Sequence, residues 1–358
     1  MKLLITGICG FVGSSLAKFW HNRADGTEVF GIDNFSRRGS EINREILTKM
    51  GIKVWHGDIR VNCDLEALPR ADWVIDAAAN PSVLAGVSGN MVSRQLVENN
   101  LSGTINVLEY CKKMNAGFIL LSTSRVYSIE QLSRLEVSVV DSAFTPVEGQ
   151  KFPVGLSCSG ISENLATSSP ISLYGATKLS SEILAMEYGA AFGFPVWINR
   201  CGVIAGAGQF GRADQGIFSF WINAFLRKKR LKYTGFGGKG YQVRDCLHPE
   251  DLFDLINMQF KSVGKNVSRI VNVGGGLARS VSLANLSRWC TEKIGFHEIE
   301  EEDRPRTYDI PWLVMDCGLA EKEFGWKPKI SLNMILHEIL EHAEKQPDWL
   351  FLSGSLNE

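Results

Sequence analysis

The chain has 358 residues, of which 45% are hydrophobic and 22% charged, and these proportions are those of a soluble globular protein. Such a length fits one large α/β unit or two lobes. The formal net charge of -1 provides no basic surface for nucleic acid or an anionic membrane, so phosphate recognition must depend on a few arginines or on backbone amides.

The cysteines and the N-terminal residues bear on the cellular location of the protein. Its eight cysteines are scattered, with no CxxC pair and no histidine at ligand spacing, so we expect no metal site and a reducing environment. The first residues, MKLLITGICGFVG, begin like a signal peptide, but glycines at positions 7, 10 and 13 interrupt the apolar region. No apolar run approaches the roughly 20 residues of a membrane span. These features predict a soluble, cytoplasmic protein.

Apolar strands alternate with helical patterns along the first part of the chain, which predicts βαβ units and a parallel sheet with helices on both faces. Continuous rather than alternating apolar runs indicate strands buried on both sides. The fold class we expect is therefore α/β, a Rossmann-type doubly wound parallel sheet. The expected strands are 2–6, 28–33, 52–59, 72–79, 117–124, 195–200 and 269–275, and the expected helices are 11–22, 91–114, 180–192 and 250–260.

The pattern weakens between Tyr127 and Tyr174, where Ser, Gly and Pro are frequent. So long an irregular stretch in a compact domain indicates a functional loop or lid, or else elements that the pattern does not reveal. From about residue 201 onward the order is again irregular. We expect one domain over 1–200 and a smaller lobe, partly interleaved with it, over 201–358.

Gly7, Gly10 and Gly13 form a GxxGxxG turn between the first strand and the first helix. A turn of this kind lets the backbone come close to a pyrophosphate, which then lies at the positive N-terminus of the helix. Asp33 ends the second strand about 20 residues later, where a carboxylate can accept hydrogen bonds from an adenosine ribose. These residues predict a dinucleotide site, although a purely structural turn followed by a strand-end aspartate has the same pattern.

Asp33 favours NAD over NADP because a carboxylate there would repel a ribose 2′-phosphate. Arg37 and Arg38, in the segment DNFSRRG, favour the opposite choice, since a nearby arginine can accept that phosphate. The prediction is NAD, with NADP left open.

Several motifs together resemble the extended short-chain dehydrogenase/reductase family over essentially the whole chain. They are the glycine turn, GD at 57–58, AAA at 77–79 and NNLSGTINVLE at 99–109. The resemblance implies that Asp58 contacts adenine, that the alanine run passes the cofactor and that Asn100 supports the active-site helix. The residues implied for NAD binding are Gly7, Gly10, Phe11, Val12, Gly13, Asp33, Asn34, Asp58, Ile59, Ala77, Ala78, Ala79, Asn100, Tyr174 and Lys178.

The segment LLSTSRVYS at 120–128 follows an expected strand, so its hydroxyls should emerge at the carboxyl end of the sheet, where open α/β sheets bind ligands. With YGATK at 174–178 it resembles the hydroxyl and YxxxK motifs of the same family. This resemblance implies Thr123, Tyr174 and Lys178 as catalytic residues. A lone YxxxK is common on ordinary helices, so the interpretation depends on the motifs occurring together.

The tyrosine and lysine suit proton transfer. A free phenol has a pKa of about 10 and is a poor base at neutral pH. A lysine ammonium beside it, with the positive nicotinamide of the oxidised cofactor, favours the phenolate. Tyr174 could then take a hydroxyl proton while hydride leaves the same carbon, and Lys178 would also hold the nicotinamide ribose.

The residues after Thr123 bear on which reaction follows oxidation of the sugar. Dehydratases of this family carry Thr-Asp-Glu where this chain has Thr123-Ser124-Arg125, so both carboxyl groups that would assist water loss are missing. A transient ketone that receives hydride on its opposite face gives an epimer without net oxidation, and the protein supplies binding and orientation. We therefore expect an epimerase.

Three segments of the second half, 205–221, 238–252 and 306–316, resemble the CDP-tyvelose epimerases, which act on CDP-paratose at carbon 2. The resemblance implies a nucleotide-diphosphate sugar as substrate. Two arginines suit a pyrophosphate because each can fork onto phosphate oxygens, although surface salt bridges would also use them. On this interpretation Arg244 and Arg306 bind the diphosphate, Asp309 binds ribose, and Thr123, Asp214, Gln215 and Tyr241 line the hexose pocket.

Two other functions remain open at this point. A 4-epimerase acting on UDP- or GDP-sugars would carry the same motifs, because no residue identifies the base. A non-catalytic NAD-binding regulator could use the same fold, but it would not need the three catalytic residues. Helices 91–114 and 172–192 offer faces for a homodimer or homotetramer, and burial within a monomer would explain their apolar faces equally well.

Overall fold

The computed structural model describes residues 1–23, 25–84, 87, 92–212 and 215–354. The chain folds into two compact units, and each unit is made of three separate segments of the chain. The first comprises Met1–Val126, Leu173–Arg200 and Phe253–Val271, and the second comprises Tyr127–Ser172, Cys201–Leu252 and Asn272–Glu358. The chain changes units after Arg200, where the sequence patterns place a domain boundary. It also changes units at other points, and the second unit holds about as many residues as the first.

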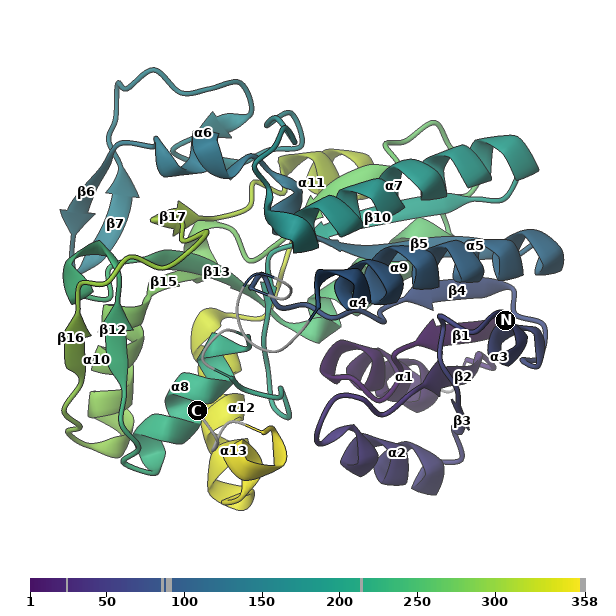
Figure 1. Cartoon of the computed structure of the whole chain (residues 1–358), viewed down its shortest axis with the longest axis horizontal. Helices are drawn as coiled ribbons and strands as arrows, with labels where there is room; N and C mark the ends of the chain where they lie inside the picture. Colours follow the sequence, from purple (N-terminus) through teal and green to yellow (C-terminus); the bar gives the residue numbers. More distant parts are fainter. Residues whose placement is uncertain (24, 85–86, 88–91, 213–214, 355–358) are drawn as a thin grey trace. The chain divides into compact units, whose positions relative to one another are not determined.

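A seven-stranded sheet forms the centre of the first unit, in the order β14-β10-β5-β4-β1-β2-β3 (Figure 1). The pairs β1–β2, β1–β4, β2–β3 and β4–β5 are parallel. The strand order reverses between β1 and β4, and this reversal is where open α/β sheets bind ligands. The expected Rossmann-type fold is confirmed. The strands are β1 Lys2–Thr6, β2 Glu28–Asp33, β3 Lys53–His56, β4 Trp73–Asp76, β5 Gly117–Thr123, β10 Val196–Cys201 and β14 Ile270–Val273.

Helices cover both faces of this sheet. Adjacent residues of a strand point to opposite faces, and on β10 Asn199 bonds to Gln259 of α9 while Arg200 bonds to Glu182 of α7. The helices α5 and α7 lie side by side (Figure 1), where the Tyr188 hydroxyl donates to Glu109 at 2.6 Å. The helical elements of this part are α1 Phe11–Arg23, α2 Ser40–Lys49, α3 Asn62–Glu66, α4 Ser93–Val97, the π-helical turn Glu98–Ser102, α5 Gly103–Met114, the 3-10 turn Ser124–Val126, α7 Ser172–Phe192 and α9 Pro249–Phe260.

The second unit is built around the small sheet β11-β13-β15, with β17 also paired to β13. Residues of α8, α10 and α12 pack into one apolar core beside it, in which Trp221 stacks on Tyr233 at 5.5 Å. Its strands are β6 Val137–Val140, β7 Ala143–Pro146, β8 Leu156–Ser157, β9 Gly160–Ile161, β11 Val203–Ile204, β12 Lys232–Thr234, β13 Val243–Leu247, β15 Ser280–Ser282, β16 Glu300–Glu302 and β17 Trp312–Leu313. Its helices are α6 Ile129–Ser133, α8 Ile217–Leu226, α10 Leu283–Ile294, α11 Gly318–Phe324, α12 Leu332–Lys345 and α13 Trp349–Leu352, with 3-10 turns at Phe236–Gly238 and Leu277–Arg279.

The irregular stretch between Tyr127 and Tyr174 contains a short helix and short strands. The second explanation, elements that the sequence pattern does not reveal, is therefore right. Helix α6 is followed by the antiparallel hairpins β6–β7 and β8–β9. Val139 and Val140 are both exposed on β6, so this strand lacks the alternation of buried and exposed residues that reveals a half-buried strand in a sequence.

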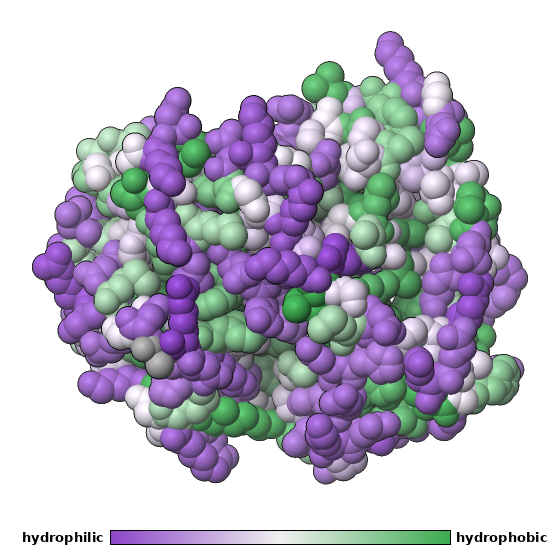
Figure 2. Space-filling view, turned by 180° about the vertical axis from the view of Figure 1, so that it is seen from behind, coloured by the Kyte–Doolittle hydropathy of each residue, from purple (hydrophilic) through white to green (hydrophobic). Residues whose placement is uncertain are grey.

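The surface carries few features that suggest a membrane or a metal. Figure 2 shows hydrophilic residues spread over one face of the molecule, with hydrophobic residues between them. Among the described residues, no helix has the length and apolar character needed to cross a bilayer. Within the same residues, no group of three or more His, Cys, Asp or Glu side chains could hold a metal ion.

Candidate functional site

The glycine turn between β1 and α1 is closely packed backbone. The Gly7 amide donates to Ile32 O at 2.9 Å, and the Gly10 amide donates to Gly7 O at 2.9 Å. A Cβ on Gly7 would lie 2.9 Å from Ala78 Cα, and a Cβ on Gly13 would lie 2.4 Å from Gly7 O. Side chains at these positions would therefore force the turn apart. Their absence leaves a backbone cradle at the N-terminus of α1, which fits a pyrophosphate.

Asp33 ends β2 beside this turn with its carboxylate held in place. Its Oδ2 accepts the Cys9 amide at 2.9 Å, and its Oδ1 accepts the Phe35 amide at 2.8 Å. Burial raises the pKa of Asp33, and these two backbone hydrogen bonds oppose the rise. Each oxygen keeps acceptor capacity beyond its one backbone bond, so the carboxylate can still receive ribose hydroxyls.

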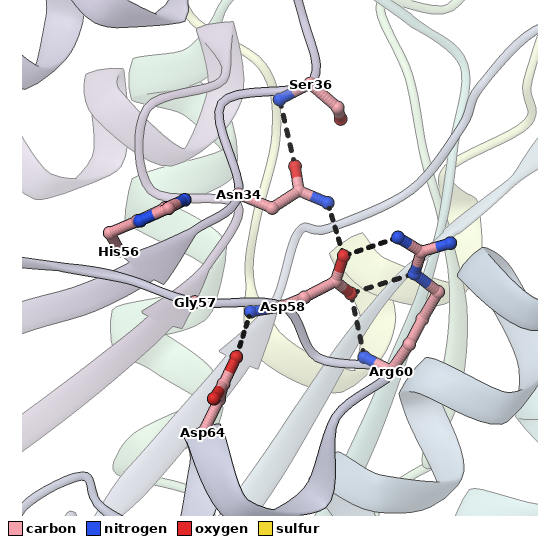
Figure 3. Close-up of a pocket in the computed structure, with 7 residues that line it drawn as sticks. All are labelled: Asn34, Ser36, His56, Gly57, Asp58, Arg60 and Asp64. Carbon is pink, nitrogen blue, oxygen red and sulfur yellow. Dashed lines mark hydrogen bonds and ion pairs between the residues drawn. The ribbon is translucent and has the colours of Figure 1, made fainter.

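A cavity of about 510 Å³ lies next to Asp33, and Asp58 is at its centre (Figure 3). Asp58 accepts hydrogen bonds from Asn34 Nδ2 at 2.9 Å and from Arg60 Nη2 at 2.6 Å. Burial alone would raise the pKa of Asp58, but the hydrogen bonds from Arg60 and Asn34 lower it to about 2. An ionised carboxylate therefore faces a polar cavity, which suits the adenosine end of a dinucleotide. The lining residues are Asn34, Ser36, His56, Gly57, Asp58, Arg60 and Asp64.

Asn100 joins the segment after β4 to α7. It lies in the π-helical turn, and such turns frequently occur at functional sites. Its Oδ1 accepts the Asn80 amide at 2.8 Å and its Nδ2 donates to Asn80 O at 3.0 Å. Its backbone oxygen accepts the Ser181 hydroxyl of α7 at 3.1 Å. Its Nδ2 also donates to the Thr177 hydroxyl of α7 at 3.4 Å, so Asn100 supports α7 through both backbone and side chain and holds the segment after β4 through its side chain.

The three residues expected to be catalytic all lie in the first unit. Thr123 is the last residue of β5, and its hydroxyl accepts the Arg125 amide at 3.2 Å. Tyr174 and Lys178 lie one turn apart near the start of α7, and both are buried. The Ser122 hydroxyl, adjacent to Thr123, donates to Glu182, one turn after Lys178. This bond places the carboxyl end of β5 against the helix that carries the tyrosine and lysine.

Sequence patterns did not reveal the buried network around Glu182. Arg200 Nη2 lies 2.7 Å from Glu182 Oε2, and their side chains are 8% and 2% exposed. The available signal was the presence of charged residues in two apolar segments, Glu182 and Glu187 in SSEILAMEYGAAF and Arg200 at the end of PVWINR. Charged residues in such segments are rarely buried unless they are paired, so each indicates a partner without naming it.

The second unit brings three of the expected substrate residues together. Arg244 Nη2 lies 3.2 Å from Asp309 Oδ1, and Asp309 Oδ1 also accepts the Ile310 amide at 3.0 Å. Burial lowers the pKa of Arg244; Asp309 raises it again and the positive charge of Arg306 lowers it further. Two guanidinium groups are therefore close enough to act on one another, and each could fork onto the oxygens of a diphosphate.

Tyr241 and Gln215 lie elsewhere in the second unit. The Tyr241 ring packs edge-on against Phe144 with centroids 5.9 Å apart, and its backbone oxygen accepts the Phe144 amide at 2.9 Å. Gln215 exchanges backbone hydrogen bonds with Arg212. Asp214, also expected in the hexose pocket, lies outside the described residues.

Comparison with known proteins identifies a family. The model of the NAD dependent epimerase/dehydratase family matches residues 3–274. Over 98% of its length, the chain is 28% identical to 99% of the CDP-paratose 2-epimerase of Salmonella typhi. Over 92% of its length, it is 26% identical to 92% of the UDP-glucuronate 4-epimerase of Thermodesulfobacterium geofontis (strain OPF15).

A solved structure agrees with this family. The UDP-glucuronic acid 4-epimerase of Bacillus cereus, in complex with UDP-glucuronic acid and NAD, superposes with a TM-score of 0.77 at 25% identity. The similarity covers 96% of this chain and 99% of that one. The fold of the two proteins is therefore shared over nearly their full lengths.

Proposed function

Because the chain belongs to the NAD dependent epimerase/dehydratase family, as an NAD-dependent nucleotide-sugar epimerase, we propose that its substrate is CDP-paratose and that it inverts carbon 2. The observation that carries the proposal is the full-length similarity to the CDP-paratose 2-epimerase. The two arginines Arg244 and Arg306, whose charges act on one another, support a diphosphate-linked substrate. The product would be CDP-tyvelose.

A second candidate is a UDP-sugar 4-epimerase, with UDP-glucuronate as its substrate. The chain is 26% identical to the UDP-glucuronate 4-epimerase of T. geofontis, close to the 28% identity with the CDP-paratose enzyme. Identities this similar do not separate the two substrates, so the base and the inverted carbon need a direct test.

The residues around the glycine turn would hold the cofactor. The backbone at Gly7, Gly10 and Gly13 would receive the pyrophosphate, Asp33 would bind the adenosine ribose, and the cavity around Asp58 would hold adenine. NAD, when bound, accepts hydride from the sugar carbon and gives it back. The protein's own residues have to orient the sugar and move its proton.

Tyr174 is the proton acceptor in this proposal. Its phenol, with an ordinary pKa of about 10, needs the positive charge of Lys178 to act as a base near neutral pH. The Thr123 hydroxyl holds the reacting sugar hydroxyl in hydrogen-bonding distance of Tyr174. Neither Ser124 nor Arg125 carries a carboxyl group, which supports reversible oxidation over water loss.

The function is tested with purified protein and a panel of CDP-, UDP- and GDP-linked sugars. We expect mass spectrometry to find NAD in the protein, and NMR to show CDP-paratose converting to CDP-tyvelose without free NADH accumulating. Conversion of UDP-glucuronate instead would establish the second candidate. If bound NAD is found and none of the sugars reacts, both proposed substrates are wrong.

Replacing Arg244 with alanine should raise the KM for the nucleotide sugar by about tenfold to a hundredfold. A hydrogen bond to a charged group is worth about 1.5–3 kcal/mol, and about 1.4 kcal/mol is tenfold in affinity. Arg288→Ala is the matched control, because Arg288 is an exposed arginine of the same unit that pairs with the exposed Asp141. Steady-state kinetics on both variants checks this prediction, and equal KM values for the two would contradict the diphosphate role.

The chain is also proposed to form a homodimer or homotetramer through α7. Leu173, Ile183 and Phe192 of this helix are exposed, and side chains of this kind gain by burial against a second copy. Light scattering of the purified protein measures the assembly, and a mass of about one chain would exclude it.

A further inference from the structure

A buried ionic network connects α7 to two strands of the central sheet. Glu182 Oε2 accepts Arg200 Nη2 at 2.7 Å and Arg200 Nε at 3.1 Å. The other oxygen, Oε1, accepts the Ser122 hydroxyl. Ser122 belongs to β5 and Arg200 to β10, so one carboxylate on the helix is bonded to both strands.

Burying this ion pair requires a reason beyond stability. The desolvation of two buried charges can exceed their mutual attraction, and apolar replacements of such pairs are often neutral or stabilising. What a buried pair supplies that apolar packing does not is a fixed geometry, because hydrogen bonds are directional while packing tolerates small shifts.

Glu182 lies on the same side of α7 as Tyr174 and Lys178. Tyr174, Lys178 and Glu182 follow each other at intervals of four residues on α7, so they lie along one side of the helix. On β5, Ser122 is adjacent to Thr123. The network thus fixes α7 against the strand end that carries Thr123, one turn away from Lys178.

We propose that Glu182 is a positioning residue that, through Ser122 and Arg200, sets the height and rotation of α7 on the sheet and so holds Tyr174 and Lys178 in line with Thr123. This inference rests on the proposed epimerase function. The Ser181 hydroxyl bonds α7 to the neighbouring Asn100 turn, whereas the Glu182 carboxylate bonds α7 to strands β5 and β10. A misplacement of about 1 Å can cost about a hundredfold in rate without loss of binding.

Two variants separate the contribution of the Ser122–Glu182 hydrogen bond from that of the Glu182–Arg200 ion pair. Ser122→Ala removes the bond to β5 and leaves the ion pair in place, so it should fold. The double variant Glu182→Gln with Arg200→Gln removes both charges together and leaves no unpaired buried ion. For each we expect kcat to fall by roughly tenfold to a hundredfold. The KM for the nucleotide sugar and the amount of bound NAD should stay within about twofold of wild type, since none of these three residues is expected to touch ligand.

A neighbouring pair on the same strand provides the control. Asn199 is adjacent to Arg200 on β10, is fully buried and exchanges two side-chain hydrogen bonds with Gln259 on the opposite face of the sheet. Asn199→Ala should lower the melting temperature at least as much as Ser122→Ala. Assayed well below that temperature, it should keep the wild-type kcat. Ser122→Thr restores a hydroxyl and should recover most of the kcat lost in Ser122→Ala.

The results distinguish this proposal from the proposed function. If the wild type epimerises a nucleotide sugar and the Ser122 and double variants keep its kcat, the positioning role is wrong and the function stands. The role is equally wrong if kcat falls in Asn199→Ala as far as in Ser122→Ala. If the wild type epimerises no nucleotide sugar, the proposed function fails and the positioning role fails with it.

Discussion

Replacing Tyr174 with phenylalanine should lower turnover at least about a hundredfold while NAD stays bound. The change removes one hydroxyl and keeps the ring, so the contact of Tyr174 with the buried Leu96 is preserved. General acid–base catalysis by a positioned side chain is typically worth about 10²–10⁴-fold, which sets the lower limit of the loss. The kcat of the purified variant, with its NAD content measured by mass spectrometry, checks this prediction.

A second buried tyrosine of the first unit provides the control. The Tyr110 hydroxyl donates to Pro69 O at 2.5 Å and accepts the Ala71 amide at 3.0 Å. Burial raises the pKa of Tyr110 to about 12, so this phenol stays neutral and only supports the fold. Tyr110→Phe should therefore lose stability and keep turnover. Near-normal turnover in Tyr174→Phe would show that another group moves the proton.

The cofactor end of the protein could be predicted from the sequence because its constraints are local. The glycines are needed by a single turn, and Asp33 is bonded to amides of that turn and of its own loop. The inner strands β1, β4, β5 and β10 are buried on both faces and therefore read as continuous apolar runs, whereas the edge strand β3 is partly exposed. Local spacing and burial were enough to predict the glycine turn and the strand-end aspartate, which the structure places beside each other.

The interactions that hold α7 on the sheet could not be predicted in this way. Ser122, Glu182 and Arg200 lie far apart in the sequence and meet only after β5, α7 and β10 have packed together. The same holds for Arg244 and Asp309, which a family resemblance assigned to the diphosphate and to ribose without indicating that they pair. Pairings of this kind depend on tertiary structure, and no local sequence pattern identifies the partner of a buried charged residue.

The second unit was also difficult to predict, for a different reason. Its strands β8, β9, β11 and β17 have two residues each, too few to show any alternation of buried and exposed positions. The FSFW segment belongs to α8, where Phe218 and Trp221 are both 2% exposed, so these side chains form core.

Gly13→Ala should weaken NAD binding by roughly tenfold to a hundredfold, although helix propensity alone favours the change. Alanine in a helix is favoured over glycine by about 1 kcal/mol. Against this, the new Cβ would lie 2.4 Å from Gly7 O and 2.9 Å from Ile8 Cα. Both contacts are backbone atoms, which cannot rotate away as a side chain can. Overpacking of this kind costs about 1–3 kcal/mol, which exceeds the gain in propensity.

The strain of Gly13→Ala should appear in cofactor affinity more than in stability, because the turn can relieve it only by opening the cradle that receives the pyrophosphate. Calorimetric titration with NAD measures the affinity, and thermal unfolding without NAD measures the stability. Ser15→Ala is the control, since Ser15 is half-buried on the same turn of α1 and its hydroxyl donates to Phe11 O within that helix. An unchanged NAD affinity in Gly13→Ala would mean that the turn accommodates a side chain without moving, and that close packing of α1 on Gly7 is not what shapes the cofactor site.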